Sequence, residues 1–190
     1  MILLHCRYMK RESIFAYLDA KAFAHAASTR SGRNLLSDFE RLMQETHGLG
    51  ADHLLDWSAH GELRNDQMGS EQVWLHLTLK TNVPLTCQRC LSPVNITVAQ
   101  KHAYRFVGSE EEAQAQDEEA EEDVLALSQD FNLAALIEDE VLMALPLIAS
   151  HETCPVEVKL AVADPDFDAG ATEKSNPFAV LVKLKGEKSS

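Results

Sequence analysis

The residues with the clearest chemical potential are Cys87 and Cys90, which form a Cys-x-x-Cys pair within the segment 86–91. The segments on either side alternate as β-strands do, so the pair is predicted to lie in a turn. Two thiols three positions apart in a turn can face one point, which is the geometry that a tetrahedral zinc ion or a reversible disulfide requires. The turn is therefore a candidate site, although one pair supplies only half of a zinc centre.

A second pair, His151 and Cys154, follows the strongest helix prediction in the chain and lies about sixty residues further on. Structural zinc sites join paired ligands from separated segments. The spacing therefore leaves two interpretations open. Either Cys87, Cys90, His151 and Cys154 form a zinc site, or the same residues are three reduced thiols and a surface histidine without metal.

Length and composition favour one domain in a reducing compartment. With 190 residues, 45% of them hydrophobic, the chain is long enough for one domain with a hydrophobic core and too short for two domains of usual size. Its four cysteines, including Cys6, are too few and too uneven for a secreted disulfide framework, so we expect a cytoplasmic protein. The apolar start meets His5 and Arg7 at once, which excludes a signal peptide or membrane span there. Residues 1–12 are expected to be an extension, and a natural start at Met9 would make the first eight accidental.

The charge balance restricts the kind of partner. The net charge is −13, with 30 acidic and 17 basic side chains, which argues against a surface that binds phosphates throughout. Contact with nucleic acid would then be local or would go through a basic protein. Nine of the fourteen residues from Glu110 to Asp123 are acidic. Residues 109–123 are therefore predicted to be a flexible solvated loop, or an arm that attracts a basic partner.

Alternating apolar residues predict a β-sheet. The alternation runs through 54–63, 73–79 and 94–107, with a turn at 65–70, and shorter strands are expected at 29–36 and 124–127. No crossover helix is apparent between these strands, so a parallel sheet is disfavoured. The predicted fold class is α+β: an antiparallel β-meander that could close into a barrel, with flanking helices, the acidic loop and a C-terminal linker.

Helices are expected on either side of the meander. Residues 13–27 read as a partly helical lead-in. Ser37 and Glu40 form a capping-box pattern that predicts a helix to about Thr46. The strongest helix prediction covers 133–145, which Pro146 ends, with one apolar face formed by Leu133, Leu136, Ile137, Val141 and Ala144.

Glu140 falls inside the apolar face of that helix, whereas Glu138 and Asp139 point elsewhere. A buried carboxylate requires a partner, and Arg89 in the cysteine turn is the predicted one, with Arg105 as the second choice. The alternative is that Glu140 lies at the rim and reaches water.

The C-terminal third divides into parts of different character. The main domain is expected to span 13–157, followed by a flexible linker over 158–175 and a short helix within 176–190. Asn176 can cap that helix, Pro177 suits its first position, and Phe178 and Leu181 begin an apolar stripe. Such a helix either docks on its own domain or anchors a partner through helix-in-groove binding.

Three motifs in this order resemble those of the bacterial YceD family, the large ribosomal RNA subunit accumulation proteins, which also have relatives in chloroplasts. They are the cysteine turn 87–90, the helix end 137–146 and the segment 176–181, and the resemblance spans about residue 14 to the end. Many family members have further cysteines after the Leu-Pro, where this chain has only His151 and Cys154. The resemblance therefore leaves zinc open.

The resemblance implies a non-enzymatic role in the accumulation or processing of large-subunit ribosomal RNA, with no catalytic residues. It gives functional weight to family-motif or partner-binding positions, which are Arg89, Glu138, Asp139, Glu140, Pro146, Asn176, Pro177, Phe178 and Leu181. The expected partner is the ribosomal RNA or its precursor particle, reached through basic ribosomal proteins or assembly factors. The competing interpretation is a zinc- or thiol-dependent protein that uses the Cys-x-x-Cys turn. A redox role would require a cysteine of lowered pKa, usually at a helix N-terminus, and a hydrolase would require converging carboxylates or histidines.

Overall fold

A computed structural model describes residues 17–66, 69–118 and 120–158 of the chain. The chain divides into two units, 1–156 and 157–190, and the account below concerns the first. The expected extension 1–12, the linker 158–175 beyond Val158 and the short helix in 176–190 lie outside the described residues.

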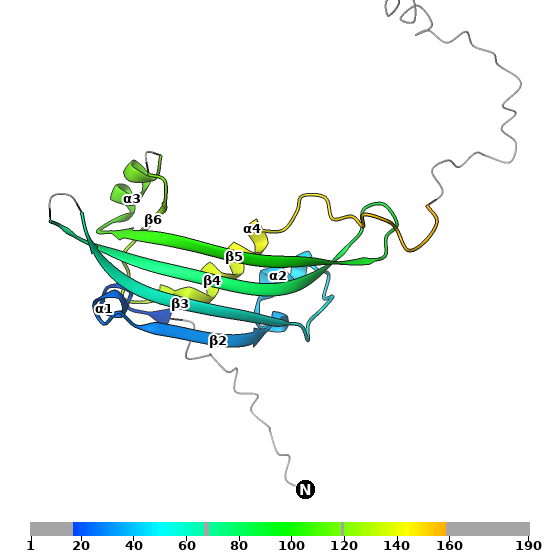
Figure 1. Cartoon of the computed structure of the whole chain (residues 1–190), viewed down its shortest axis with the longest axis horizontal. Coiled ribbons are helices and arrows are strands. Elements are labelled where there is room, and N and C mark those ends of the chain that lie inside the picture. Colours follow the sequence, from blue (N-terminus) through cyan, green and yellow to red (C-terminus); the bar gives the residue numbers. More distant parts are fainter. Residues whose placement is uncertain (1–16, 67–68, 119, 159–190) are drawn as a thin grey trace, which may run out of the picture. The chain divides into compact units, whose positions relative to one another are not determined.

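The first unit is built on an open five-stranded sheet, which confirms the α+β class (Figure 1). Four strands form the expected antiparallel meander in chain order, with the β3–β4 hairpin around residues 65–70. The fifth strand pairs parallel to its neighbour. The strands are β2 (Thr29–Leu35), β3 (Leu54–Asn65), β4 (Glu71–Thr86), β5 (Pro93–Val107) and β6 (Asp123–Ala126). Because β2 and β6 are its edges, the sheet does not close into a barrel.

The acidic segment that was predicted to be a loop contains a helix, α3 (Glu110–Asp117). The Ser109 hydroxyl accepts a hydrogen bond from the Glu112 N–H, and the Glu112 carboxylate accepts one from the Gly108 N–H, so the helix start is capped reciprocally. Acidic side chains in the first turn also lie at the positive end of the helix dipole. This helix is the crossover that the sequence did not reveal, and it permits the parallel pairing of β5 and β6.

Three further helices pack on the face of the sheet that holds the core: α1 (Ala20–His25), α2 (Glu40–Glu45) and α4 (Leu133–Met143). A two-stranded ribbon of β1 (Tyr17–Leu18) and β7 (Phe131–Asn132) precedes α1 and α4. The predicted cap at Ser37 is wrong, because Ser37 lies in a 3-10 turn (Leu36–Asp38) and Phe39 occupies the cap position of α2 without a side-chain bond. Within the described ranges, no helix combines the length and apolar character needed to cross a membrane.

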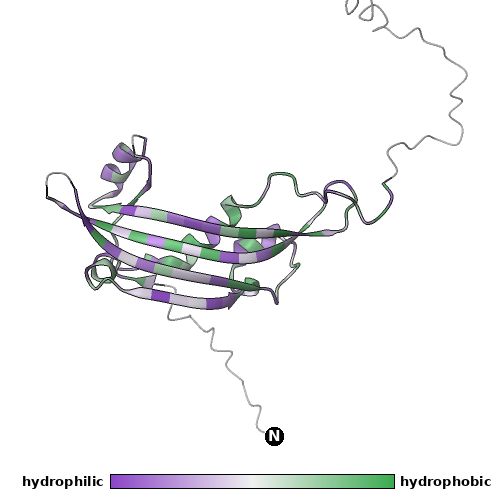
Figure 2. Ribbon diagram, viewed as in Figure 1, coloured by the Kyte–Doolittle hydropathy of each residue, from purple (hydrophilic) through white to green (hydrophobic). Residues whose placement is uncertain are grey.

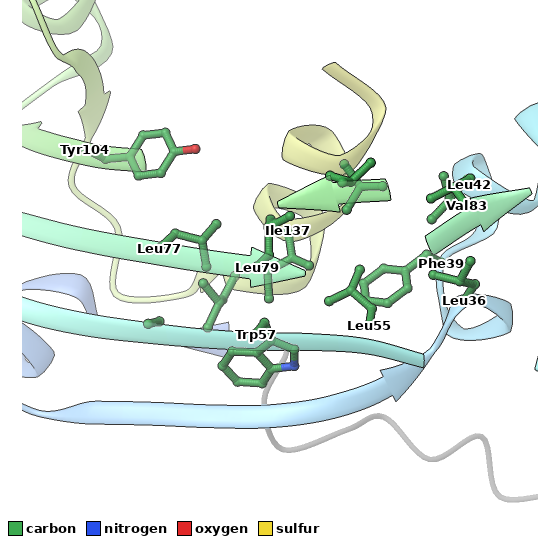
Figure 3. Packing of buried hydrophobic residues seen from close by; sticks show 14 of the residues in the cluster. Leu36, Phe39, Leu42, Leu55, Trp57, Leu77, Leu79, Val83, Tyr104 and Ile137 are labelled. Carbon is green, nitrogen blue, oxygen red and sulfur yellow. The ribbon is translucent and has the colours of Figure 1, made fainter. Parts of the chain in front are cut away.

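The core lies between the helices and one face of the sheet (Figure 3). Alternate residues of β3 and β4, such as Leu55 and Leu79, point into it and meet Ile137 of α4, which is fully buried. The intervening residues of the same strands face the other side and are mostly polar (Figure 2). The two faces of the central strands therefore differ sharply in chemistry.

Close packing of α1 on β3 requires the glycine at position 61. A Cβ there would lie 2.8 Å from both the Ala24 Cα and the Phe23 carbonyl oxygen, which belong to the helix backbone. We expect Gly61→Ala to lower the free energy of unfolding by about 1–3 kcal/mol, because overpacking against backbone cannot relax cheaply. Urea unfolding of Gly61→Ala and of the control Gly108→Ala measures this. At Gly108 the nearest atom is the Glu112 carboxylate oxygen at 3.1 Å, a side-chain end that can shift where backbone cannot, so an equal loss in both variants would contradict the interpretation.

Candidate metal centre

The Cys-x-x-Cys pair lies in the tight turn between β4 and β5, as the sequence predicts. The Cys87 N–H donates to the Ser92 carbonyl at 2.9 Å, and the Leu91 N–H donates to the Cys87 carbonyl at 2.9 Å. Leu91 adopts a left-handed conformation with φ of 59°, which allows the chain to reverse here. Cys87 is fully buried and Cys90 partly so, so both thiols face inward from the turn.

A single backbone hydrogen bond brings the second pair to this turn. After α4 ends at Met143, the chain continues to the β4–β5 turn (Figure 1). The Gln88 N–H donates to the Ala149 carbonyl at 2.8 Å, and Ala149 itself is buried. This contact fixes the segment two residues before His151, so that His151 and Cys154 reach the turn.

The four predicted ligands converge: the atoms that Cys87, Cys90, His151 and Cys154 offer all lie within 4.8 Å of one another. The Cys90 Sγ and His151 Nδ1 atoms are 3.4 Å apart. A tetrahedral zinc ion with bonds of about 2.3 Å to sulfur and about 2.0 Å to nitrogen holds these atoms roughly 3.5 Å apart. The donor set and its spacing therefore fit a four-coordinate Cys₃His centre.

The histidine has the orientation that a metal ligand needs. Its Nε2 atom lies 3.1 Å from the Pro93 carbonyl oxygen. A proton on Nε2 donates to that carbonyl, which leaves the lone pair of Nδ1 directed at the sulfur atoms. Metal-bound histidines usually make this second hydrogen bond, because it fixes both tautomer and ring orientation.

The surroundings favour thiolates at the turn. Burial raises the pKa of Cys87, but the backbone N–H groups of Cys90, His151 and Arg89 stabilise the thiolate more strongly and bring the pKa to about 5. Burial opposes ionisation of Cys90 as well, yet its pKa is lowered, with the Ser92 N–H as the main cause. Burial and the neighbouring Cys90 raise the pKa of Cys154. The hydrogen bond between the His151 side chain and Cys87 raises the pKa of His151.

The low pKa of Cys87 also meets one requirement of a redox thiol, so the pKa alone does not exclude that role. Access argues against it. An attacking thiol must reach an external disulfide, whereas Cys87 has no exposed surface. The lowered pKa of Cys87 arises from backbone N–H groups of the turn and of His151, and not from a helix N-terminus. The geometry thus favours a ligand cluster over thiol exchange.

Helix α4 nearly buries the carboxylates of both Glu138 and Glu140, whose side chains are 11% and 14% exposed, so Glu138 does not point away as predicted. The Oε1 atom of Glu138 accepts the Leu42 N–H at 3.0 Å while Oε2 accepts from Arg41 Nε at 2.9 Å. Leu42 is the third residue of α2, so this carboxylate caps the helix whose own cap residue, Phe39, supplies no bond. Asp139 pairs with the same Arg41 guanidinium from an exposed position. Sequence reasoning missed Arg41, because nothing local marks a contact across 97 positions.

The predicted pairing of Glu140 with Arg89 or Arg105 is wrong. Glu140 Oε2 lies 3.6 Å from His102 Nδ1, and the Glu140 side chain is 14% exposed. Burial and the nearby Glu140 carboxylate raise the pKa of Tyr104, whose hydroxyl is enclosed beside it. Arg105 pairs with Glu122 at 2.6 Å.

Arg89 and Pro146 are exposed. Arg89 acts on the site through its backbone N–H, and Pro146 stands just beyond the end of α4. The remaining predicted positions, Asn176, Pro177, Phe178 and Leu181, lie outside the described residues.

Removing the carboxylate that caps α2 tests this contact. We expect Glu138→Ala to lower the free energy of unfolding by about 1–3 kcal/mol, since it leaves a buried N–H without its acceptor. The matched control Asp139→Ala removes an exposed ion pair and should cost less than about 1 kcal/mol. Denaturant unfolding of both variants measures the difference. Equal effects would contradict the assignment of the cap to Glu138.

Comparisons with known proteins match a region of the chain that contains these residues. The family model described as "Large ribosomal RNA subunit accumulation protein YceD" matches residues 75–185, which include all four candidate ligands and α4. A curated relative of that name from Haemophilus influenzae is 32% identical over 109 residues. The alignment covers 56% of this chain and 62% of the relative, so less than two thirds of the relative's length is spanned. No solved structure matches.

Proposed function

This chain belongs to the YceD family of large ribosomal RNA subunit accumulation proteins, and from this premise we propose that it acts without catalysis in the accumulation of large-subunit ribosomal RNA. The observation that carries the proposal is the family match over 75–185, which contains the whole candidate metal centre. The absence of catalysis is part of the proposal and rests on the family match. Glu138 caps α2. Glu140 lies with His102 and Asp123 in a group whose nitrogen and oxygen atoms are within 4.8 Å of one another.

The metal centre is proposed to hold structural zinc. Cys87, Cys90, Cys154 and the Nδ1 atom of His151 would be its ligands. A structural zinc ion supplies cohesion and no reaction. Here it would join the end of the β4–β5 hairpin to the segment after α4, which in the described residues is held there by the Gln88–Ala149 hydrogen bond. This cohesion would present Arg89 and Leu91, both exposed at the tip of the turn, on a rigid base.

Metal analysis of the purified chain tests the zinc proposal. We expect about one zinc per chain, bound by the wild type and by the control Cys6→Ser, and little in Cys90→Ser/Cys154→Ser. Removal of the metal should lower the midpoint of thermal unfolding, because binding to a structural site is coupled to folding. Retention of zinc by the double variant, or its absence from the wild type, would contradict the proposed ligand set.

The partner is proposed to be a basic ribosomal protein or assembly factor that binds the acidic surface of α3. Among the described residues of 110–123, seven acidic side chains are exposed: Glu110, Glu111, Glu112, Asp117, Glu118, Glu121 and Asp123. Such a surface attracts cationic partners and raises association rates at low salt. Four of these carboxylates, those of Glu110, Glu111, Glu112 and Asp117, lie on α3, so their backbone positions are set by the helix.

Depletion and rescue in cells test the functional proposal. Depletion should lower the ratio of large- to small-subunit ribosomal RNA, and wild type should restore it. Rescue should fail with Cys87→Ser/Cys90→Ser and weaken with Glu118→Lys/Glu121→Lys, which reverses charge at the end of α3 where a cation suits the helix dipole. The control Cys6→Ser should rescue fully. An unchanged ratio after depletion would contradict the proposed role.

A further inference from the structure

The face of the sheet opposite the core is free of α1, α2 and α4 along its central strands (Figure 1). Helix α3 contacts this face only at the β5–β6 end, where the Arg105 guanidinium donates to Gln116. The rest consists of alternate residues of β2, β3, β4 and β5, brought into rows by the antiparallel register. The side chains on this face include aromatic rings and lysines, whereas the chain as a whole is acidic.

One row of this face carries stacked rings. His60 lies directly opposite His76, with ring centroids 6.2 Å apart and planes inclined by 26°. The buried Trp74 ring is also parallel to His76, with centroids 6.4 Å apart, and the Arg64 guanidinium lies 4.6 Å from the Trp74 ring centroid. The Glu62 carboxylate accepts from Arg64 at 2.9 Å and lies 2.7 Å from His76 Nε2, which fixes the orientation of the imidazole. The rings thus form a preorganised series across two strands.

The next two rows carry small hydroxyls and then cations. Ser58 and Thr78 have short side chains and form the row next to the His60–His76 pair. Lys101 lies opposite Thr78 in the same row. Lys80 follows one row further on, diagonal to Lys101. Both lysines are exposed, and within the described residues neither makes an ion pair, whereas the acidic Asp56 of that row is paired with Arg33. Two lysines without an ion pair therefore stand on this face, Lys101 one row from the His60–His76 pair and Lys80 two rows from it, opposite Asp56.

We propose that this sheet face binds single-stranded RNA, with bases stacking on the His60–His76 rings and phosphates contacting Lys80 and Lys101. Aromatic or imidazole rings on an open sheet accept unstacked bases, and nearby cations hold the backbone. A duplex offers no free base faces to such rings. A basic protein partner would be repelled by these lysines and suits the α3 surface instead. The choice of RNA rests on the proposed function, and direct RNA contact goes beyond it.

Fluorescence anisotropy with a labelled twelve-nucleotide single-stranded RNA of mixed sequence tests the proposal on the full chain. We expect His60→Ala/His76→Ala to weaken binding about fivefold or more, since stacking contributes about 1–3 kcal/mol per base. Lys80→Ala/Lys101→Ala should reduce the slope of log affinity against log salt by about 1.4, at about 0.7 per phosphate contact on a single strand. A change of slope reports lost phosphate contacts and not a general loss of stability.

The matched control is Lys21→Ala, an exposed lysine on α1, the helix that packs at Gly61 on the core side of β3. It should leave affinity and slope near those of wild type. The inference would be overturned if the wild type bound no RNA at low salt, or if the control lost as much affinity as the lysine variant. It would also be overturned if the wild type bound a basic ribosomal protein and Lys80→Ala/Lys101→Ala did not. Full rescue of the ribosomal RNA ratio in depleted cells by Lys80→Ala/Lys101→Ala would overturn the importance of this face while leaving the accumulation role intact.

Discussion

The packing of α4 against the sheet is the interaction on which the other features depend. Leu133, Ile137 and Val141 repeat at helical spacing and are all fully buried, and each contributes about 1.5–3 kcal/mol by leaving water. This stripe fixes the rotation of α4 about its axis. Once that rotation is set, every other side chain of the helix has a defined direction.

Two consequences follow along the helix. Glu138 is turned toward α2, where it supplies the cap that Phe39 lacks and also receives Arg41. At the C-terminal end, the chain leaves α4 beside the β4–β5 turn, so that Ala149 can accept from Gln88 and His151 can approach Cys87. Helix α4 thereby positions both helix α2 and the candidate metal centre, which are far apart in the sequence.

Much of this arrangement could be predicted where the signal is local or repeats regularly. Alternation predicted β3, β4 and β5, and helical spacing predicted α4. The pairing of Cys87 and Cys90 with His151 and Cys154 followed from ligand chemistry, because few other residues could complete the site. These features depend on periodicity and donor type, both of which are readable in a single sequence.

The features that were missed depend on contacts distant in the chain or on competing local rules. The Ser37 capping pattern was overridden by a carboxylate 96 positions from Leu42. The high density of acidic residues led to the prediction of a loop where α3 lies. Ser109 and Glu112 nevertheless form a cap that fits the capping-box pattern. For Glu140, helical spacing placed the residue near the core face, but no rule of sequence could choose His102 over Arg89 as its neighbour.

Convergence of four ligands from two segments on one zinc ion is tested most directly by X-ray absorption at the zinc edge of the purified full chain. Three sulfur atoms at about 2.3 Å and one nitrogen at about 2.0 Å are expected. A first shell of oxygen atoms, or of two sulfur atoms with the remainder from water, would show that the segment after α4 does not complete the site formed by Cys87 and Cys90.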